Sequence, residues 1–119
     1  MYERAGIFRT EERLTSCLDT IHRLRERARD VVVDDRGDRF NTDLTSVLEL
    51  ESMLEMADCL VTGALARQES RGAHTRLDHP ERDDERWLRH TLTWYDNGAV
   101  RLDYKPVTMT RYQPQVRTY

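Results

Sequence analysis

The stretch NTDLTSVLELESMLEMADCLVTGALARQ, residues 41–68, decides the fold of this chain. Asn41 or Thr42 can cap a helix, and Asp43 places an acid in its first turn, where the helix dipole favours negative charge. Apolar residues then recur at helical spacing to the end of the stretch. They are too dense for a single stripe, so this helix is expected to contact neighbours on two sides, with Leu54 between the two stripes in the core.

A first helix is predicted over Glu11 to Arg29, because Thr10 can cap it and apolar residues follow at helical spacing. It supplies only one neighbour for residues 41–68, so the second must come from the tail, from another chain or from residues upstream of Met1. Residues 1–10 carry no cap and no clear period, and we interpret them as the remnant of an upstream segment. The apolar positions of the first helix are Leu14, Leu18, Ile21, Leu24 and Ala28.

The rest of the chain is more polar. Residues 70–90 are predicted to form a charged loop followed by a short helix that begins at Asp83 and carries Trp87 and Leu88. Residues 91–95 and 99–104 alternate apolar with polar side chains around a turn sequence, which predicts a β-hairpin. An irregular tail completes residues 91–119. Before the second helix, Val31–Val33 indicate a short extended piece that ends in a turn.

Taken together, these patterns predict one domain over residues 1–119, with two long helices over 11–69. The expected fold class is mainly α: a helical bundle of the spectrin-like three-helix type, from which part of one helix can be missing, with a C-terminal β-hairpin and an irregular tail. Cys17 and Cys59 lie in apolar helical stripes without paired spacing, so buried free thiols are favoured over a disulfide.

Composition excludes several classes of protein. The chain has 119 residues with 38% hydrophobic and 34% charged side chains, and its formal net charge is −3. Acids and bases are interleaved, so a nucleic-acid partner is not expected. The charge-free stretches are far shorter than the ~20 residues that span a bilayer, so direct membrane insertion is not expected either. The N-terminus shows no basic-then-apolar signal, and nothing predicts secretion.

Chemical motifs are scarce. The five glycines are isolated, so no phosphate-binding loop is expected, and no serine nucleophile has a Gly-x-Ser-x-Gly frame. His74, Asp78, His79 and His90 are close in sequence but do not show zinc-ligand spacing, and we expect no metal. The adjacent acids at positions 83 and 84 would point in different directions, and we interpret them as helix-start residues.

The segment from Arg71 to Arg86 is the most distinctive. Its alternating arginines and acids fit either a solvated loop or an interface between domains. The motif around it resembles the signature of the C-terminal domain of the flavoprotein subunit of succinate dehydrogenase and fumarate reductase. Further resemblance lies at residues 5–10, 40–42, 101–104 and 117–119. The motif is Ala64-x-x-Arg67-x-Glu69-Ser70-Arg71-Gly72-Ala73-His74-x-Arg76-x-Asp78-x-Pro80-x-Arg82-Asp83-Asp84-x-x-Trp87-x-x-His90-Thr91.

This resemblance implies that the parent subunit interconverts succinate and fumarate with covalently held FAD, passing electrons through an iron–sulfur subunit to quinone at the membrane. It implies a cytoplasmic location, peripheral to the inner face of the cell membrane. In the family the flavin-carrying and substrate-binding residues lie upstream, and no position here matches them. No catalytic residue and no cofactor are therefore expected in this chain, and the chain alone is expected to be inactive.

The resemblance therefore implies a structural and docking role for this chain. Its direct partner would be the flavin-binding domain of the same subunit. One alternative is the corresponding domain of L-aspartate oxidase, which shares the Glu-Ser-Arg-Gly core. The other is a free-standing helical interaction module derived from this domain. The docking candidates are Arg71, Gly72, His74, Arg76, Asp83 and Asp84.

Overall fold

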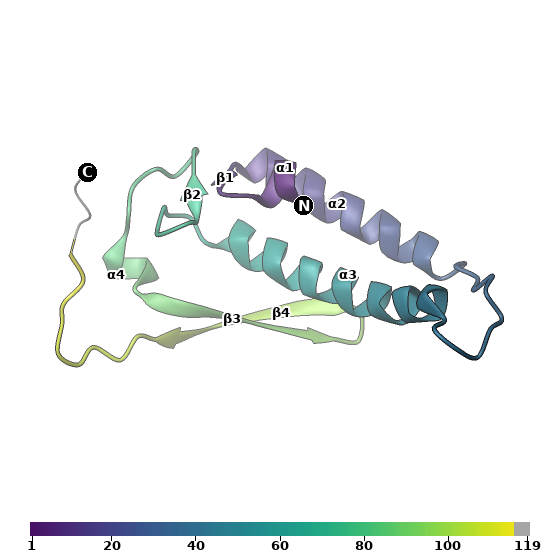
Figure 1. The fold of residues 1–119 in the computed structure, drawn as a ribbon. Coiled ribbons are helices and arrows are strands. Elements are labelled where there is room, and N and C mark those ends of the chain that lie inside the picture. Colours follow the sequence, from purple (N-terminus) through teal and green to yellow (C-terminus); the bar gives the residue numbers. More distant parts are fainter. Residues whose placement is uncertain (116–119) are drawn as a thin grey trace.

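The computed structural model describes residues 1–115 as an elongated body of 56 × 32 × 31 Å (Figure 1). Two long helices lie side by side, and a β-hairpin packs along the second of them. The mainly helical fold with a C-terminal antiparallel hairpin confirms the predicted fold class. The elements are α1 (Tyr2–Ala5), β1 (Phe8–Arg9), α2 (Glu11–Ala28), α3 (Thr42–Ala66), β2 (Thr75–Arg76), α4 (Asp84–Trp87), β3 (Arg89–Asp96) and β4 (Ala99–Pro106).

Helix α2 begins as the sequence predicts. The Thr10 hydroxyl accepts a hydrogen bond from the Arg13 N–H at 3.2 Å, which satisfies one of the free donors of the first turn. Its buried residues recur at i, i+3 and i+7, a spacing that places them on one face of the helix, and they join the core with α3. These residues are Leu14, Cys17 and Ile21.

Helix α3 also begins at its predicted cap, where the Asn41 side chain accepts from the Leu44 N–H at 2.8 Å. Leu54 is buried in the core that α3 forms with α2, as expected. The helix ends at Ala66, two residues before the predicted end. Arg67 takes an extended conformation there, and the carbonyls of the last helical turn bond to the side chain of Arg76 in β2 instead of continuing the helical ladder.

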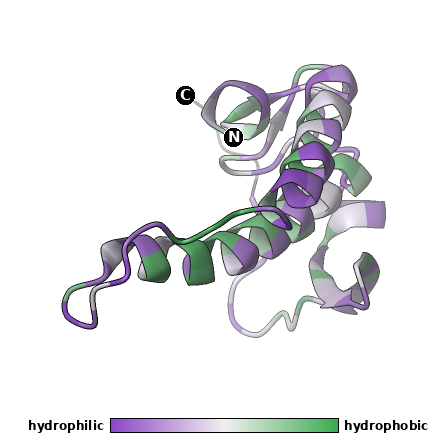
Figure 2. Ribbon diagram, turned by 90° about the vertical axis from the view of Figure 1, so that its right-hand side faces the viewer, coloured by the Kyte–Doolittle hydropathy of each residue, from purple (hydrophilic) through white to green (hydrophobic). Residues whose placement is uncertain are grey.

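The second neighbour of α3 is the hairpin, so the chain's own C-terminal part supplies it. A Cβ placed on Gly63 would lie 3.4 Å from a methyl carbon of Thr93, which shows how closely β3 approaches the helix. Hydrophobic and hydrophilic stretches alternate along the helices (Figure 2), and α3 keeps several apolar side chains in solvent. These exposed residues are Leu44, Leu48, Met53, Met56 and Leu60.

The hairpin is longer than predicted, because β3 extends three residues and β4 two residues beyond the alternating pattern and the two strands still pair there. Asn97 and Gly98 form the connecting turn with φ angles of 49° and 85°. Two successive left-handed residues give a turn whose twist matches that of the strands, which explains the Asn-Gly sequence. At the other end, the rings of Trp87 and Tyr104 meet edge to face with centroids 5.7 Å apart.

Some details could not be expected from the sequence. Residues 1–10 contain a helical turn and a strand, which their short length hid from any periodicity. The short extended piece predicted at residues 31–33 pairs with no strand among the described residues. Cys17 is buried but Cys59 is only half-buried, and both are free. The predicted family resemblance at residues 117–119 lies outside the described part of the chain. None of the helices described is long and apolar enough to cross a membrane.

Candidate functional site: an ion-pair network at the end of α3

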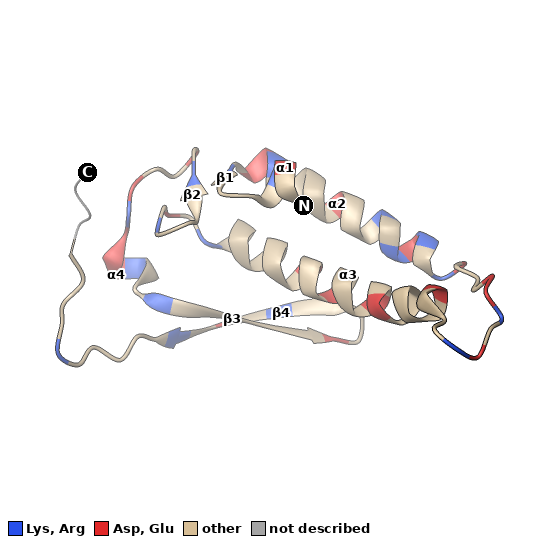
Figure 3. Ribbon diagram, viewed as in Figure 1, with Lys and Arg blue, Asp and Glu red and all other residues tan. Residues whose placement is uncertain are grey.

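Residues 69–86 fold back over the C-terminal end of α3. Their backbone makes two tight turns, closed by the bridges Arg71–His74 and Arg76–His79. The charges of this region lie between β2 and α4 (Figure 3). The segment is therefore ordered by its own hydrogen bonds and is not a featureless solvated loop.

Glu69 is the centre of the network and is fully buried. Its carboxylate accepts from the guanidinium of Arg67, from Nε and Nη2 of Arg71 at 2.8 and 3.0 Å, and from the backbone N–H of Asp83 at 2.9 Å. Two arginines and a backbone donor compensate the removal of this carboxylate from water. This acid thereby joins the end of α3, the following turn and the start of α4.

Arg76 is the second fully buried charge. Its Nε and Nη2 donate to the two carboxylate oxygens of Asp78, each at 2.8 Å, in a bidentate pair. Its Nη1 donates to the carbonyls of Ala64, Leu65 and Arg67 at 3.3, 3.0 and 3.1 Å. A cation at this position satisfies carbonyls that the end of a helix leaves free and complements the negative end of the helix dipole.

Arg67 connects the network to the hairpin. Its guanidinium donates to the carbonyls of Trp87, at 3.0 Å, and Arg89. It also lies over the Trp87 ring, 5.3 Å from the centroid. Arg89 lies over the same ring and over that of Tyr104, at 4.8 and 3.8 Å. Cation–π contacts of this kind hold α4 and the base of the hairpin against the end of α3.

His74 ties the N-terminal segment to the same end of the molecule. Its Nδ1 lies 2.7 Å from Nη1 of Arg9, and its Nε2 lies 3.1 Å from the carbonyl of Arg67. An arginine is only a donor, so Nδ1 must accept and Nε2 carries the proton of a neutral ring. Burial lowers the pKa of His74, and the charges of Arg9, Arg76 and Arg67 act in the same direction.

The outer side of the network is partly exposed. Arg71 bridges Glu69 and Asp84, and these carboxylates raise its pKa above the usual value. Arg82 also pairs with Asp84, so hydrogen bonds from two arginines lower the pKa of this acid. The side chains of Arg71 and Asp84 are 28% and 36% exposed, so they are accessible to a partner. The Asp83 side chain caps α4 by accepting from the Arg86 N–H.

Gly72 occupies the tip of the first turn. Its φ of 59° lies in the left-handed region, where residues with a Cβ are strained, and a Cβ built there would meet nothing within 4 Å. The glycine is thus required by backbone conformation within the chain. The space beside it is open to a partner.

All six docking candidates fall within this one segment, but they differ in accessibility. Arg71, Gly72, Asp83 and Asp84 lie on its outer side, whereas Arg76 is fully buried and His74 is half-buried against Arg9. Their docking role stays a prediction. The internal partners that organise these candidates are not evident from the sequence, although the motif contains most of them. The unidentified partners are Arg9, Arg67, Glu69 and Ser70.

The four residues considered as metal ligands, His74, Asp78, His79 and His90, do not come together in the fold. His74 contacts Arg9 instead. Asp78 and His79 approach Glu11, with one ligand atom of each within 4.8 Å of the others. Asp78 is already bound by Arg76 and by the Glu11 N–H, and the Arg76 bond holds its pKa well below the usual range. An acid paired with an arginine in this way is a poor metal ligand.

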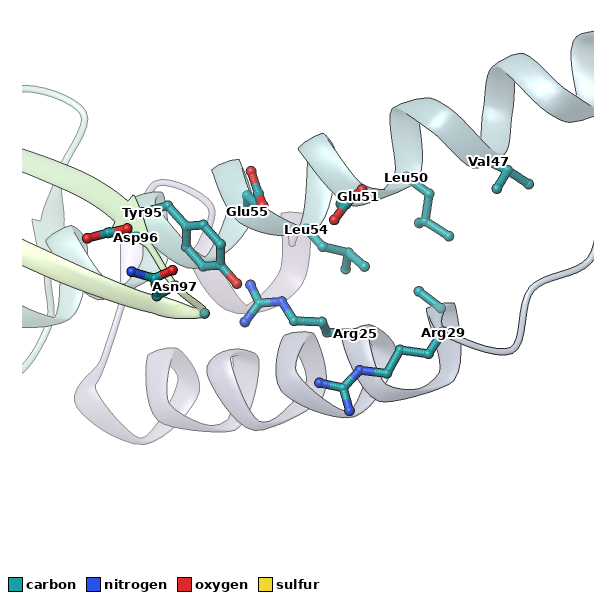
Figure 4. A pocket seen from close by; sticks show the side chains of 12 residues that line it. Arg25, Arg29, Val47, Leu50, Glu51, Leu54, Glu55, Tyr95, Asp96 and Asn97 are labelled. Atoms are coloured by element: carbon teal, nitrogen blue, oxygen red, sulfur yellow. The ribbon is translucent and has the colours of Figure 1, made fainter.

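A cavity of about 690 Å³ lies elsewhere, between the C-terminal half of α2, the first half of α3 and the hairpin turn (Figure 4). Arg25 projects into it, but this guanidinium donates to Asp58 at 3.1 Å and lies 4.9 Å from the centre of the Tyr95 ring. Arg29, on the same side, pairs with Glu26. None of the predicted site residues lines this cavity.

Comparison with known proteins identifies the family. The sequence model of the fumarate reductase flavoprotein C-terminal region matches residues 1–119. The fumarate reductase flavoprotein subunits of Haemophilus influenzae and Mycobacterium tuberculosis are 43% and 47% identical over 120 and 116 residues, which are 100% and 97% of this chain. The succinate dehydrogenase flavoprotein subunit of Rickettsia bellii is 43% identical over 118 residues, or 98% of the chain. The chain covers 20% of each of these relatives.

Solved structures agree with the sequence match. A chain of Escherichia coli quinol fumarate reductase superposes with a TM-score of 0.91 at 42% identity, over 96% of this chain and 20% of the other. The Mycobacterium smegmatis Sdh1 complex gives 0.75 at 30% identity, over 89% and 18%. The chain belongs to the family of C-terminal domains of succinate dehydrogenase and fumarate reductase flavoprotein subunits.

Proposed function

We propose that this chain is the structural and docking domain of a flavoprotein subunit that interconverts succinate and fumarate. The observation that carries the proposal is the family match over residues 1–119. The matched region makes up one fifth of the relatives' length. In this proposal FAD and the substrate-binding groups lie in the remaining four fifths of the flavoprotein subunit, and an iron–sulfur subunit carries the electrons from there to quinone. The whole assembly would lie at the inner face of the cell membrane.

The residues that the structure describes, 1–115, do not fit an FAD site. A flavin dinucleotide needs a glycine-rich turn and free donors for its pyrophosphate. The glycines are isolated, and both arginines of the cavity between α2, α3 and the hairpin are already paired with carboxylates. We therefore assign no redox step to this chain.

The docking role divides between two groups of residues. Arg71, Asp83 and Asp84 present partly exposed charges, and Arg71 directly precedes the open turn at Gly72. Arg76 and His74, which lie inside, hold the backbone that carries these charges. A surface fixed before binding loses little entropy on association, so a rigid charged segment favours docking to a defined partner surface.

Two glycines provide a matched test. Gly72 and Gly98 both have positive φ, and a Cβ on either would meet nothing within 4 Å. Alanine at each position therefore introduces similar backbone strain, on the order of 1–2 kcal/mol. If the flavin-binding part of the subunit packs on the segment, Gly72→Ala should weaken its association with the chain at least tenfold. Gly98→Ala, in the hairpin turn, should bind as the wild type does.

The experiment is co-expression of the chain with the flavin-binding part of the subunit, followed by purification through a tag on the chain and titration of the two parts. Flavin absorbance that follows the tag supports the docking role. Equal association of both alanine variants would show that the Gly72 turn does not touch the partner. Absence of any association for the wild type would favour the free-standing interaction module.

A further inference from the structure

The two-residue strand β1 forms an unusual pair with β2. The strands are parallel, and the N–H groups of Thr75 and Leu77 donate to the carbonyls of Ile7 and Arg9 at 3.1 and 2.9 Å. Parallel strands otherwise occur almost only inside larger sheets with both faces covered. A parallel sheet of two strands on a surface therefore has the form of an incomplete sheet.

The outer edge of β2 is already closed. There the Ser70 hydroxyl accepts from the Arg76 N–H at 2.9 Å and donates to carbonyls of the same turn, including that of Arg76 at 3.2 Å. The His79 N–H also donates to the Arg76 carbonyl. No further strand can pair on this side, so the sheet can be extended only at β1.

The outer edge of β1 is open. Alternate residues of a strand direct their backbone groups to opposite edges, and Ile7 and Arg9 face β2. The N–H and C=O of Phe8 therefore face outward, and within residues 1–115 neither is hydrogen-bonded. Apolar side chains of β1 and its neighbours are exposed: Phe8 is 61% exposed and Ile7 57%, and Leu77, which follows β2, is 55% exposed. Exposed apolar residues beside an unpaired strand edge mark a docking site for another strand.

We propose that the open edge of β1 accepts an extended strand from the upstream part of the flavoprotein subunit. The inference rests on the function proposed above. In the relatives, four fifths of the polypeptide lies outside the matched region. Residues that precede Met1 in a longer chain would enter beside this edge, because Met1 and α1 pack on α2 next to β1. Strand addition then supplies backbone hydrogen bonds, and the partner covers the apolar side chains.

A pair of substitutions isolates the backbone contribution. Phe8→Ala and Phe8→Pro both remove the ring, but only proline removes the outward N–H. The inward bonds come from the neighbouring residues, so the β1–β2 pair does not use the group that proline deletes. In titrations of the chain against the flavin-binding part of the subunit, Phe8→Pro is expected to bind at least tenfold more weakly than Phe8→Ala. Amide exchange at Thr75 and Leu77 reports whether the β1–β2 pair survives in each variant.

Hydrogen exchange on the wild-type protein gives a second measurement, which needs no variant. The Phe8 amide should exchange at least tenfold more slowly in the reconstituted subunit than in the chain alone. A subunit that assembles with an unchanged Phe8 amide would overturn the inference and leave the docking role intact. If protection of the Phe8 amide increases with the concentration of the chain alone, the edge of β1 pairs with a second copy of the chain. That result would also overturn the inference. If no subunit assembles, the proposed function itself fails.

Discussion

Glu69→Gln is the sharpest test of the buried network. The substitution preserves the size of the side chain but removes the charge that pairs with Arg67 and Arg71, and its amide group presents donors to two guanidinium groups. Breaking a buried ion pair destabilises a protein by about 3–5 kcal/mol. Because Arg71 is partly exposed and can regain water, we expect about 3 kcal/mol, near the lower end of that range.

For a chain of this length, each kcal/mol lowers the melting temperature by roughly 4 °C, so Glu69→Gln should lower it by about 12 °C. Thermal unfolding followed by circular dichroism measures this shift. Glu49→Gln is the matched control, because Glu49 is exposed on α3 and forms no ion pair within the described residues. It should stay within about 0.5 kcal/mol of the wild type. Equal melting of the two variants would refute the central role of Glu69.

Three further outcomes are expected. Leu54→Ala should destabilise the chain by about 2–5 kcal/mol in urea titrations, because it leaves a cavity between α2 and α3. His74 is neutral in the fold and its pKa is depressed, so its stabilising effect should be complete above pH ~6.5 and lost as the pH falls further. His74→Gln should flatten that loss of stability, whereas His79→Gln should not. Gly6→Ala should speed amide exchange at Thr75 and Leu77, which bond to the segment that follows Gly6, because the new Cβ would lie 2.5 Å from the Tyr2 carbonyl oxygen.

The long elements could be predicted because their signals are local. A cap, a helical period and an Asn-Gly turn each act within a few residues, so α2, α3 and the hairpin followed from the sequence. Strands β1 and β2 could not, since each has two residues and exists only by pairing across more than sixty positions. The end of α3 was misplaced for the same reason. Arg76, ten residues beyond Ala66, bonds to the last carbonyls of that helix.

The candidate site shows a similar division. Arg71, His74, Arg76, Asp83 and Asp84 are near one another because the chain turns twice within one short segment. Their different burial could not be predicted, since a sequence of alternating charges does not reveal which charges face inward. Burial of a charge depends on partners that the fold assembles, here α3, the N-terminal strand and the hairpin.

The network is more suited to fixing geometry than to adding stability. Apolar residues of similar volume often stabilise a core as well as a buried ion pair does. Ion pairs with bidentate hydrogen bonds, in contrast, fix the relative orientation of the groups that they join. Here they join Arg9 of the N-terminal strand, the end of α3 and the turn at His74. The open edge of β1 and the open space at Gly72 are consequently held in a fixed relation through His74 and Arg9. A partner that engages both would meet a surface ordered before binding, and loss of either contact should weaken association without unfolding the chain.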